Sequence, residues 1–364
     1  MVAEKAFKAY EKRKTTYVLV QPWMDWKSKQ RDDSKRRIRI EESWIPCSGS
    51  KWGHDLHVTT YAPLDALKIK GVAVCFHGLG NFGEREYYYF APWLADHGFI
   101  AFVPDMPYFG HNIIHRGAHG RIGSWNSQIE AMTTCVSWSL QKAGTVVGST
   151  GLPWIVVGIS MSGLGVLDWG INQFNEQHLD PKVMGRCNGI AALVPALEFR
   201  IKIHPIKKFL GFIVGKLAPN YVFDQKTPPD TATSLAKVSH DKLSVQWCVP
   251  CIETGSMFGL EGDKGTASYE VDCFPGSPVS TLSKLYLAAN RVRKTANKWP
   301  RVPLLCTGSG KDDLVDPAGA SEFLSRIDQS IPHQYIFHEG WYHPQLGELD
   351  REELFKEILA FSRV

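Results

Sequence analysis

The sequence predicts an α/β protein with a mostly parallel central sheet and helices on both faces. Short apolar runs, typical of buried parallel strands, alternate with helical patterns from residue 72 onward. This alternation lapses between residues 195 and 303, which is more chain than a crossover helix needs and indicates an inserted unit. The alternation then resumes and ends in an amphipathic helix with apolar residues at Leu354, Phe355, Ile358, Leu359 and Phe361.

These observations divide the chain into three parts. Residues 1–41 are a polar, charge-rich extension that we expect to form a solvated arm. Residues 42–195 and 296–364 form the core that contains the sheet, and residues 196–295 form a helical cap inserted into it. A chain of 364 residues, of which 44% are hydrophobic and 21% charged, is long enough for one such core with its cap.

The core elements are predicted in chain order from local patterns. Residues 56–61 alternate as an early strand, and further strand patterns cover residues 72–76, 99–104, 154–157, 188–194, 303–308 and 334–338. Ser127 and Glu130 have the spacing of a capping box, which predicts a helix that opens there. In the cap, residues 197–218 mix apolar and basic residues. They form either a helix pair packed on the core or an amphipathic surface that meets a membrane. Residues 279–297 predict the helix that returns to the core.

Ser160 lies in a strand-turn-helix setting that is typical of a nucleophile elbow. A strand pattern leads into Gly158-Ile159-Ser160-Met161-Ser162-Gly163, and a helical pattern follows. Such a turn strains the backbone of its central residue and requires small neighbours, which Gly158 and Ser162 supply with Gly163 beside them. A serine between small residues also occurs in ordinary loops, so this interpretation depends on other parts of the chain.

A loop rich in glycine follows the strand at residues 72–76. It begins with His77 and Gly78 and can present a backbone N–H group at the edge of the sheet. Together with the N–H of the residue after a nucleophile, such a loop forms an oxyanion hole, and here the two donors would be Leu79 and Met161. The alternative is an ordinary strand-to-helix turn with a structural histidine.

An acid and a histidine follow in the order that a nucleophile, acid and histidine triad requires. Asp312, Asp313 and Asp316 compete for the acid after a late strand. We choose Asp312, because it comes first after the turn and the chain then returns to the core, and we place Asp313 second; surface turns are also rich in aspartate for their own reasons. His343 lies on the loop after the last strand, where its ring can reach both partners. His338 lies within the strand pattern and ranks behind it.

These four segments together resemble the α/β-hydrolase superfamily, within it the branch of monoglyceride lipases and lysophospholipases grouped with the S33 serine aminopeptidases. Residues 99–105, Gly110-His111 and residues 120–125 resemble that branch as well. Its members usually carry a Gly-His-Gly-x-Ser turn and a Gly-His-Ser-Met-Gly-Gly elbow, whereas this chain has Gly110-His111-Asn112 and the elbow given above. The resemblance covers residues 42–364 and is weakest between residues 196 and 295.

The resemblance implies an α/β-hydrolase fold and a serine hydrolase that cleaves the ester of a monoacylglycerol or lysophospholipid through an acyl-enzyme. His343 would deprotonate Ser160, Asp312 would orient the imidazole, and water would release the acid, with neither metal nor organic cofactor. Two alternatives stay open. The triad could act as an esterase, thioesterase or peptidase on a small acyl substrate, or the fold could be a non-catalytic binding subunit. The sequence indicates no oligomeric state.

Composition excludes several other classes of function. The net charge of +4 is spread among 37 acidic residues, so we expect no nucleic-acid partner. No apolar stretch has the length of a signal peptide core or a spanning helix. We therefore expect a cytoplasmic protein whose membrane contact would be peripheral, through the cap. Cys248 and Cys251 have redox-motif spacing, and His111, His115 and His119 repeat every four residues, but neither set has the context of a redox or metal site.

Overall fold

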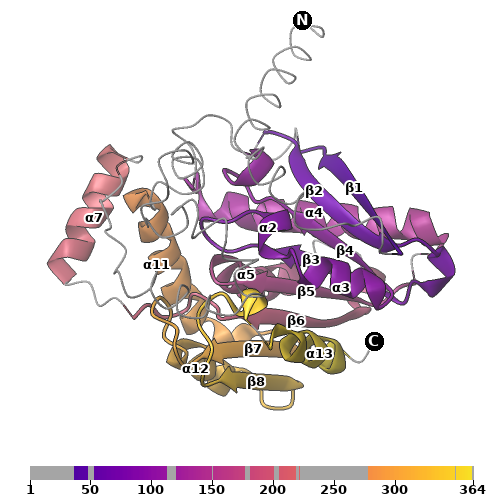
Figure 1. Ribbon diagram of the computed structural model, residues 1–364. Helices are drawn as coiled ribbons and strands as arrows, with labels where there is room; N and C mark the ends of the chain where they lie inside the picture. The colour runs from indigo at the N-terminus through magenta and orange to yellow at the C-terminus, as the bar shows by residue number, and fades with distance from the viewer. Residues whose placement is uncertain are drawn as a thin grey trace, which may run out of the picture.

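The computed structural model describes residues 37–47, 53–112, 120–149, 151–176, 181–200, 205–218, 221, 278–348 and 350–362. An eight-stranded sheet with the order β1-β2-β4-β3-β5-β6-β7-β8 lies at the centre of this part (Figure 1). The pairs β1 with β2 and β2 with β4 are antiparallel, and all other pairs are parallel. The predicted, mostly parallel sheet is therefore confirmed. Its strands are β1 (Ile38–Ile45), β2 (Leu56–Pro63), β3 (Gly71–Phe76), β4 (Phe99–Pro104), β5 (Trp154–Ile159), β6 (Cys187–Leu193), β7 (Leu304–Ser309) and β8 (His333–His338).

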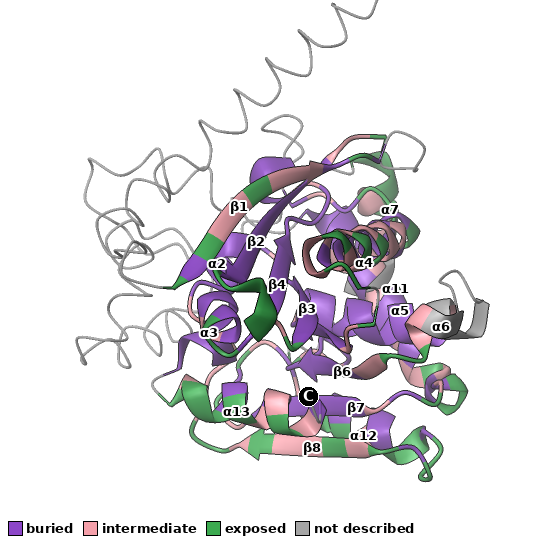
Figure 2. Ribbon diagram, turned by 90° about the vertical axis from the view of Figure 1, so that its right-hand side faces the viewer, coloured by how far each residue is buried: buried purple, intermediate pink, exposed green. Residues whose placement is uncertain are grey.

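Helices cover both faces of the sheet, as predicted. Alternate residues of β3 point to opposite faces, so that Val72 and Val74 join one hydrophobic cluster and Ala73 and Cys75 join the other. Helices α4, α5, α11 and α12 pack on the first cluster, and α3 and α13 pack on the second. Figure 2 shows the central strands buried between these layers. The described helices are α2 (Gly83–Glu86), α3 (Phe90–Asp96), α4 (Trp125–Val147), α5 (Met161–Glu176), α6 (Pro181–Met184), α7 (Pro205–Leu217), α11 (Val279–Lys294), α12 (Ala318–Arg326) and α13 (Arg351–Ser362), with short turns η2 (Ala66–Lys68), η3 (Gly110–Asn112), η5 (Ala296–Lys298) and η6 (Gln345–Gly347).

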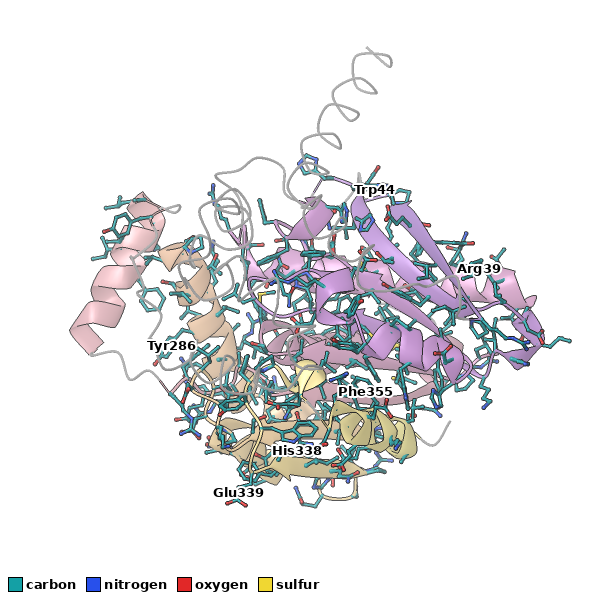
Figure 3. The ribbon with its side chains drawn as sticks, viewed as in Figure 1. Arg39, Trp44, Tyr286, His338, Glu339 and Phe355 are labelled. Carbon is teal, nitrogen blue, oxygen red and sulfur yellow. The ribbon has the colours of Figure 1, made fainter. Side chains whose placement is uncertain are left out.

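The start of the core differs from the prediction. Residues 38–41 were expected to belong to the polar extension, but they are the first half of β1 and pair with β2. Ile38 is buried, and charged residues such as Arg39 alternate with the apolar ones. This strand lies at the edge of the sheet, where one row of side chains faces water, so its apolar pattern is diluted by charge. Figure 3 shows Arg39 and Trp44 near opposite ends of β1.

Helix α4 begins three residues before the predicted start. Its N-cap is Ser124, whose hydroxyl accepts a hydrogen bond from the Ser127 N–H at 3.0 Å. The Ser124 N–H in turn donates to the Ser127 hydroxyl at 3.3 Å. Ser127 thus plays the part at position N3 that Glu or Gln plays in most capping boxes, and the prediction of Ser127 as the cap was wrong.

Two helices between β6 and β7 lie in the segment that was predicted to be the cap. The predicted return helix is α11, which ends at Lys294, and α7 packs beside it (Figure 1). Asp168 of α5 holds α11 in place, because its carboxylate accepts from Trp125 Nε1 at 2.6 Å and pairs with Arg291. Cys248 and Cys251 lie outside the described residues, and the boundaries of the cap stay a prediction. Every helix in the described ranges is too short or too polar to cross a bilayer.

Candidate active site

Ser160 is the single residue between β5 and α5, and its backbone is strained. Its φ of 56° lies in the left-handed region, which residues with a side chain rarely adopt. Hydrogen bonds on both sides hold this conformation. The Ser160 N–H donates to the Leu193 carbonyl at 2.9 Å, and the Ser160 carbonyl accepts from the N–H groups of Leu164 and Ala196, each at 3.0 Å. The strain places the Ser160 hydroxyl at the carboxyl edge of the sheet.

The small residues of the elbow are required by close approach. A Cβ atom on Gly158 would lie 2.3 Å from the Ser162 carbonyl oxygen, and one on Gly163 would lie 2.9 Å from the Leu193 carbonyl oxygen. Ser162 does more than limit bulk, because its hydroxyl donates to the His77 carbonyl at 2.5 Å. The residue that departs from the usual glycine therefore ties the elbow to the loop after β3.

His343 links Ser160 to Asp312 through two hydrogen bonds. Its Nε2 lies 2.8 Å from Ser160 Oγ, and its Nδ1 lies 2.6 Å from Asp312 Oδ2. The other oxygen of Asp312 accepts from the N–H groups of Leu314 and Val315, each at 2.9 Å, and the side chain is buried. An ionised carboxylate only accepts, so Nδ1 carries the proton and the Nε2 lone pair faces the serine hydroxyl.

The competing residues lie apart from this hydrogen-bond chain. Asp313 is exposed to solvent, and Asp316 accepts from the Ala318 N–H at the start of α12. His338, at the end of β8 (Figure 3), stacks on Trp341 with 3.7 Å between ring centroids. The structure therefore brings together Ser160, Asp312 and His343 and leaves the second-choice residues outside.

Several groups act on the pKa of His343. Burial alone would lower it, because a buried imidazolium loses its hydration. The Asp312 carboxylate opposes this effect through its charge and its hydrogen bond, and the charge of Glu86 adds to it. The balance raises the pKa of His343 above its ordinary value. The charged imidazolium that forms when His343 takes a proton is thus stabilised where it stands.

The loop after β3 lies directly against Ser160. A Cβ atom on Gly78 would be 3.3 Å from the Ser160 Cβ atom. Leu79 follows on this loop, and Met161 opens α5. Among the described residues, the N–H groups of Leu79 and Met161 have no hydrogen-bond acceptor, so both remain able to donate to a ligand.

His77 shapes this loop rather than facing the serine. Its Nε2 accepts from the Met106 N–H at 2.9 Å, so Nδ1 carries the proton and donates to the Gly78 carbonyl at 2.8 Å. Burial lowers the pKa of His77, which keeps the ring neutral and suited to this pair of bonds.

A second buried histidine cluster was missed by the sequence analysis. The Nδ1 atoms of His57 and His111 lie 3.2 and 2.8 Å from the same oxygen, Asp105 Oδ2, and the two ring centroids are 3.8 Å apart. Burial lowers the pKa of His57, but the nearby carboxylates of Asp105 and Glu42 favour its charged form and raise the pKa to about 9. The other oxygen of Asp105 accepts from the Gly83 N–H at 2.8 Å, so this ionic cluster supports the start of α2. Asp105 after a strand pattern and the Gly110-His111 pair could be recognised in the sequence, but nothing in the sequence indicated that His57 on β2 contacts them.

This cluster is also the group of described residues whose imidazole and carboxylate ligand atoms lie within 4.8 Å of one another. The two rings are tilted by only 32°, nearly face to face. Their Nδ1 atoms converge on one carboxylate oxygen rather than on a space between three ligands. A hydrogen-bonded ion cluster fits this arrangement better than a metal site. His115 and His119 lie outside the described residues.

Comparison with known proteins places this geometry in a family. A family described as "Serine aminopeptidase, S33" matches residues 68–252, just over half of the chain. The chain belongs to this family. As an S33 family member it is 24% identical over 291 residues to Phospholipase YtpA of Bacillus subtilis (strain 168), in a match that covers 80% of this chain and 94% of that protein.

Solved structures share the fold of this S33 family member. A soluble variant of monoglyceride lipase from Saccharomyces cerevisiae superimposes with a TM-score of 0.62 and 14% identity, over 88% of this chain and 94% of that chain. The monoacylglycerol lipase of Paleococcus ferrophilus gives a TM-score of 0.56 and 17% identity, over 84% of this chain and 98% of that chain. The predicted α/β-hydrolase fold and the resemblance to this branch are confirmed.

Proposed function

We propose that the protein is a serine hydrolase that cleaves the carboxylic ester of a monoacylglycerol, a lysophospholipid or a similar single-chain lipid. The observation that carries this proposal is the unbroken hydrogen-bond chain from a strained Ser160 through His343 to the buried Asp312, at 2.8 and 2.6 Å. The names of the relatives support the lipid substrate, because one is a phospholipase and two are monoacylglycerol lipases.

The proposed reaction passes through an acyl-enzyme. His343 Nε2 takes the proton of the Ser160 hydroxyl while Oγ bonds to the acyl carbon, and the carbonyl electrons move to its oxygen. The N–H groups of Leu79 and Met161 hold this oxyanion. When the carbonyl re-forms, the ester bond to the alcohol breaks, and the alcohol leaves with the proton from His343. Water then repeats the sequence on the acyl-enzyme, and the acid is released. Asp312 keeps the imidazole oriented and stabilises its charged form throughout.

The proposal includes peripheral contact with a membrane through α7, for a protein located in the cytoplasm. Leu217, the last residue of this helix, is 81% exposed, Tyr221 beyond it is 51% exposed, and Lys216 directly precedes Leu217. An apolar end with a lysine suits the interface of an anionic bilayer. Co-sedimentation with phosphatidylglycerol vesicles should fall for Leu217→Glu and stay unchanged for Leu67→Glu, because Leu67 is 95% exposed but lies in η2, outside this helix.

A fluorophosphonate probe tests the nucleophile. The probe should label Ser160, read by peptide mass, and His343→Ala should abolish labelling while the protein stays folded. The substrate is then tested by measuring hydrolysis of monoolein, lysophosphatidylcholine, p-nitrophenyl acetate and an aminoacyl amide. A higher kcat/KM for the two long-chain lipids supports the proposal. Turnover of p-nitrophenyl acetate or the aminoacyl amide alone would favour the small-substrate alternative. Folded protein that the probe does not label, with or without detergent, would point to a non-catalytic subunit.

A further inference from the structure

A buried carboxyl group lies behind the loop that carries Leu79. Glu86, the last residue of α2, is 5% exposed. Its Oε2 atom accepts from the Gly78 N–H at 3.2 Å and from Asn81 Nδ2 at 2.9 Å. Both donors belong to the same short loop, one on each side of Leu79. The reaction proposed above gives this carboxyl group no part.

We propose that Glu86 is a positioning residue for the oxyanion hole, an inference that rests on the proposed function. The C=O and N–H of one peptide bond point in opposite directions because the bond is planar and trans. The Gly78 carbonyl shares its peptide plane with the Leu79 N–H, and His77 Nδ1 holds that carbonyl at 2.8 Å. The Leu79 N–H therefore points away from His77.

Glu86 fixes the preceding peptide plane, which joins His77 to Gly78. By accepting the Gly78 N–H it sets the direction of that amide, and by accepting from the Asn81 side chain it holds the far end of the loop. A Cβ atom on Gly78 would lie 3.3 Å from Glu86 Oε2 and 3.3 Å from Ser160 Cβ, so Gly78 stands between the carboxyl and the serine. Glu86 thus holds the loop from behind while the next N–H remains available in front.

The location of this carboxyl also gives it an electrostatic effect. The titratable groups that act with it are Arg85 and Tyr87 beside it in the chain and His343 on the loop after β8. Burial raises the pKa of Glu86, while its bonds from Gly78 and Asn81 and the charge of His343 oppose that rise. The negative charge of ionised Glu86 in turn raises the pKa of His343. A purely structural hydrogen bond would not couple to His343 in this way.

The experiment compares Glu86→Ala and Glu86→Gln with Glu84→Ala as the matched control. Glu84 is also buried on the same helix, and its Oε1 atom accepts from the Tyr61 hydroxyl at 3.3 Å. The measurements are kcat and KM for p-nitrophenyl butyrate, the inhibition constant of a trifluoromethyl ketone, the melting temperature and the pH dependence of kcat/KM. The ketone becomes a tetrahedral oxyanion on Ser160, so its affinity reports on the oxyanion hole.

Glu86→Ala should lower kcat by about 10- to 100-fold while KM changes by less than about twofold. Binding of the ketone should weaken by the same factor as kcat, because a misplaced N–H donor stabilises the oxyanion less. Glu86→Gln should keep most of kcat, since its amide oxygen still accepts from the loop. Its acid limb of kcat/KM should move to lower pH, because the charge that raises the pKa of His343 is gone. Glu84→Ala should leave kcat and ketone affinity unchanged.

Several results would overturn the inference. One is folded Glu86→Ala with unchanged kcat, and another is an equal loss of kcat in Glu84→Ala. If Glu86→Ala does not fold, Glu86→Gln decides, and an acid limb at the wild-type pH would reject the coupling. A wild-type protein that the fluorophosphonate does not label would overturn the proposed function and this inference with it. A labelled wild type with unaffected Glu86 variants would overturn this inference alone.

Discussion

The buried cluster around His57 should make the stability of the protein fall at alkaline pH. The pKa of His57 is about 9 in the folded protein, against an ordinary value of 6.5. Below pH 6.5 both states hold the proton and the stabilisation is fully present, and it is lost as the pH rises through 9. The difference of about 2.5 pKa units corresponds to roughly 3 kcal/mol. This is an upper value, because Glu42, which contributes to the shift, is 35% exposed and screened by water.

Urea unfolding of the wild type and of His57→Gln at pH 6 and pH 9.5 measures this effect. The free energy of unfolding should fall by up to about 3 kcal/mol more in the wild type than in the variant, which has no proton to lose at this position. His97→Gln is the control, because His97 is exposed on the surface beside Trp93. An identical loss in wild type and His57→Gln would show that His57 is not charged in the folded protein.

Three further predictions concern the site itself. Asp312→Asn should lower kcat about 10³- to 10⁴-fold because the imidazole loses its orienting acceptor, whereas Asp313→Asn should change it less than about twofold in steady-state ester hydrolysis; the reverse ranking would reject the assignment. Gly158→Ala should prevent closure of the elbow, because the added Cβ would lie 2.3 Å from the Ser162 carbonyl, and a normal melting temperature with normal probe labelling would contradict this. The pH profile of kcat/KM should fall on the acid side with an apparent pKa above 6.5, since protonated His343 cannot accept the serine proton; a midpoint below 6.5 would exclude the raised pKa.

The parts of this protein that could be predicted from sequence are those whose signal is local. Buried parallel strands are short apolar runs, so the central strands from residue 71 onward were predicted to within a few residues. The segment around Ser160 was predictable for the same reason, because a strand, a tight turn and a helix follow one another directly. Asp312 and His343 were predictable from their order after late strands.

What could not be predicted depends on contacts between distant segments. His57 appeared as one residue of an alternating strand, because nothing near it reveals that Asp105 and His111 fold against it. Ser162 was interpreted by size alone, since the acceptor of its hydroxyl lies 85 residues away. Glu86 fell in a polar segment after the loop, where an exposed carboxylate is the usual expectation.

The same long-range bonds explain why the three catalytic candidates stand at hydrogen-bond distance although they come from separate loops. The Thr307 hydroxyl of β7 accepts from the Val194 N–H after β6 at 3.0 Å and donates to Gln345 Oε1 at 2.6 Å. The Gln345 side-chain amide also donates to Ser309 Oγ at 2.8 Å. The backbone N–H of Gln345 donates to the His343 carbonyl at 2.9 Å. A buried neutral network of this kind resists distortion, because each broken bond would leave an unsatisfied polar group in the core. These bonds fix the ends of β6 and β7 and the histidine loop to each other. Ser162 takes part in none of these bonds, so its hydroxyl adds a bond to the loop after β3 without replacing any bond of this network.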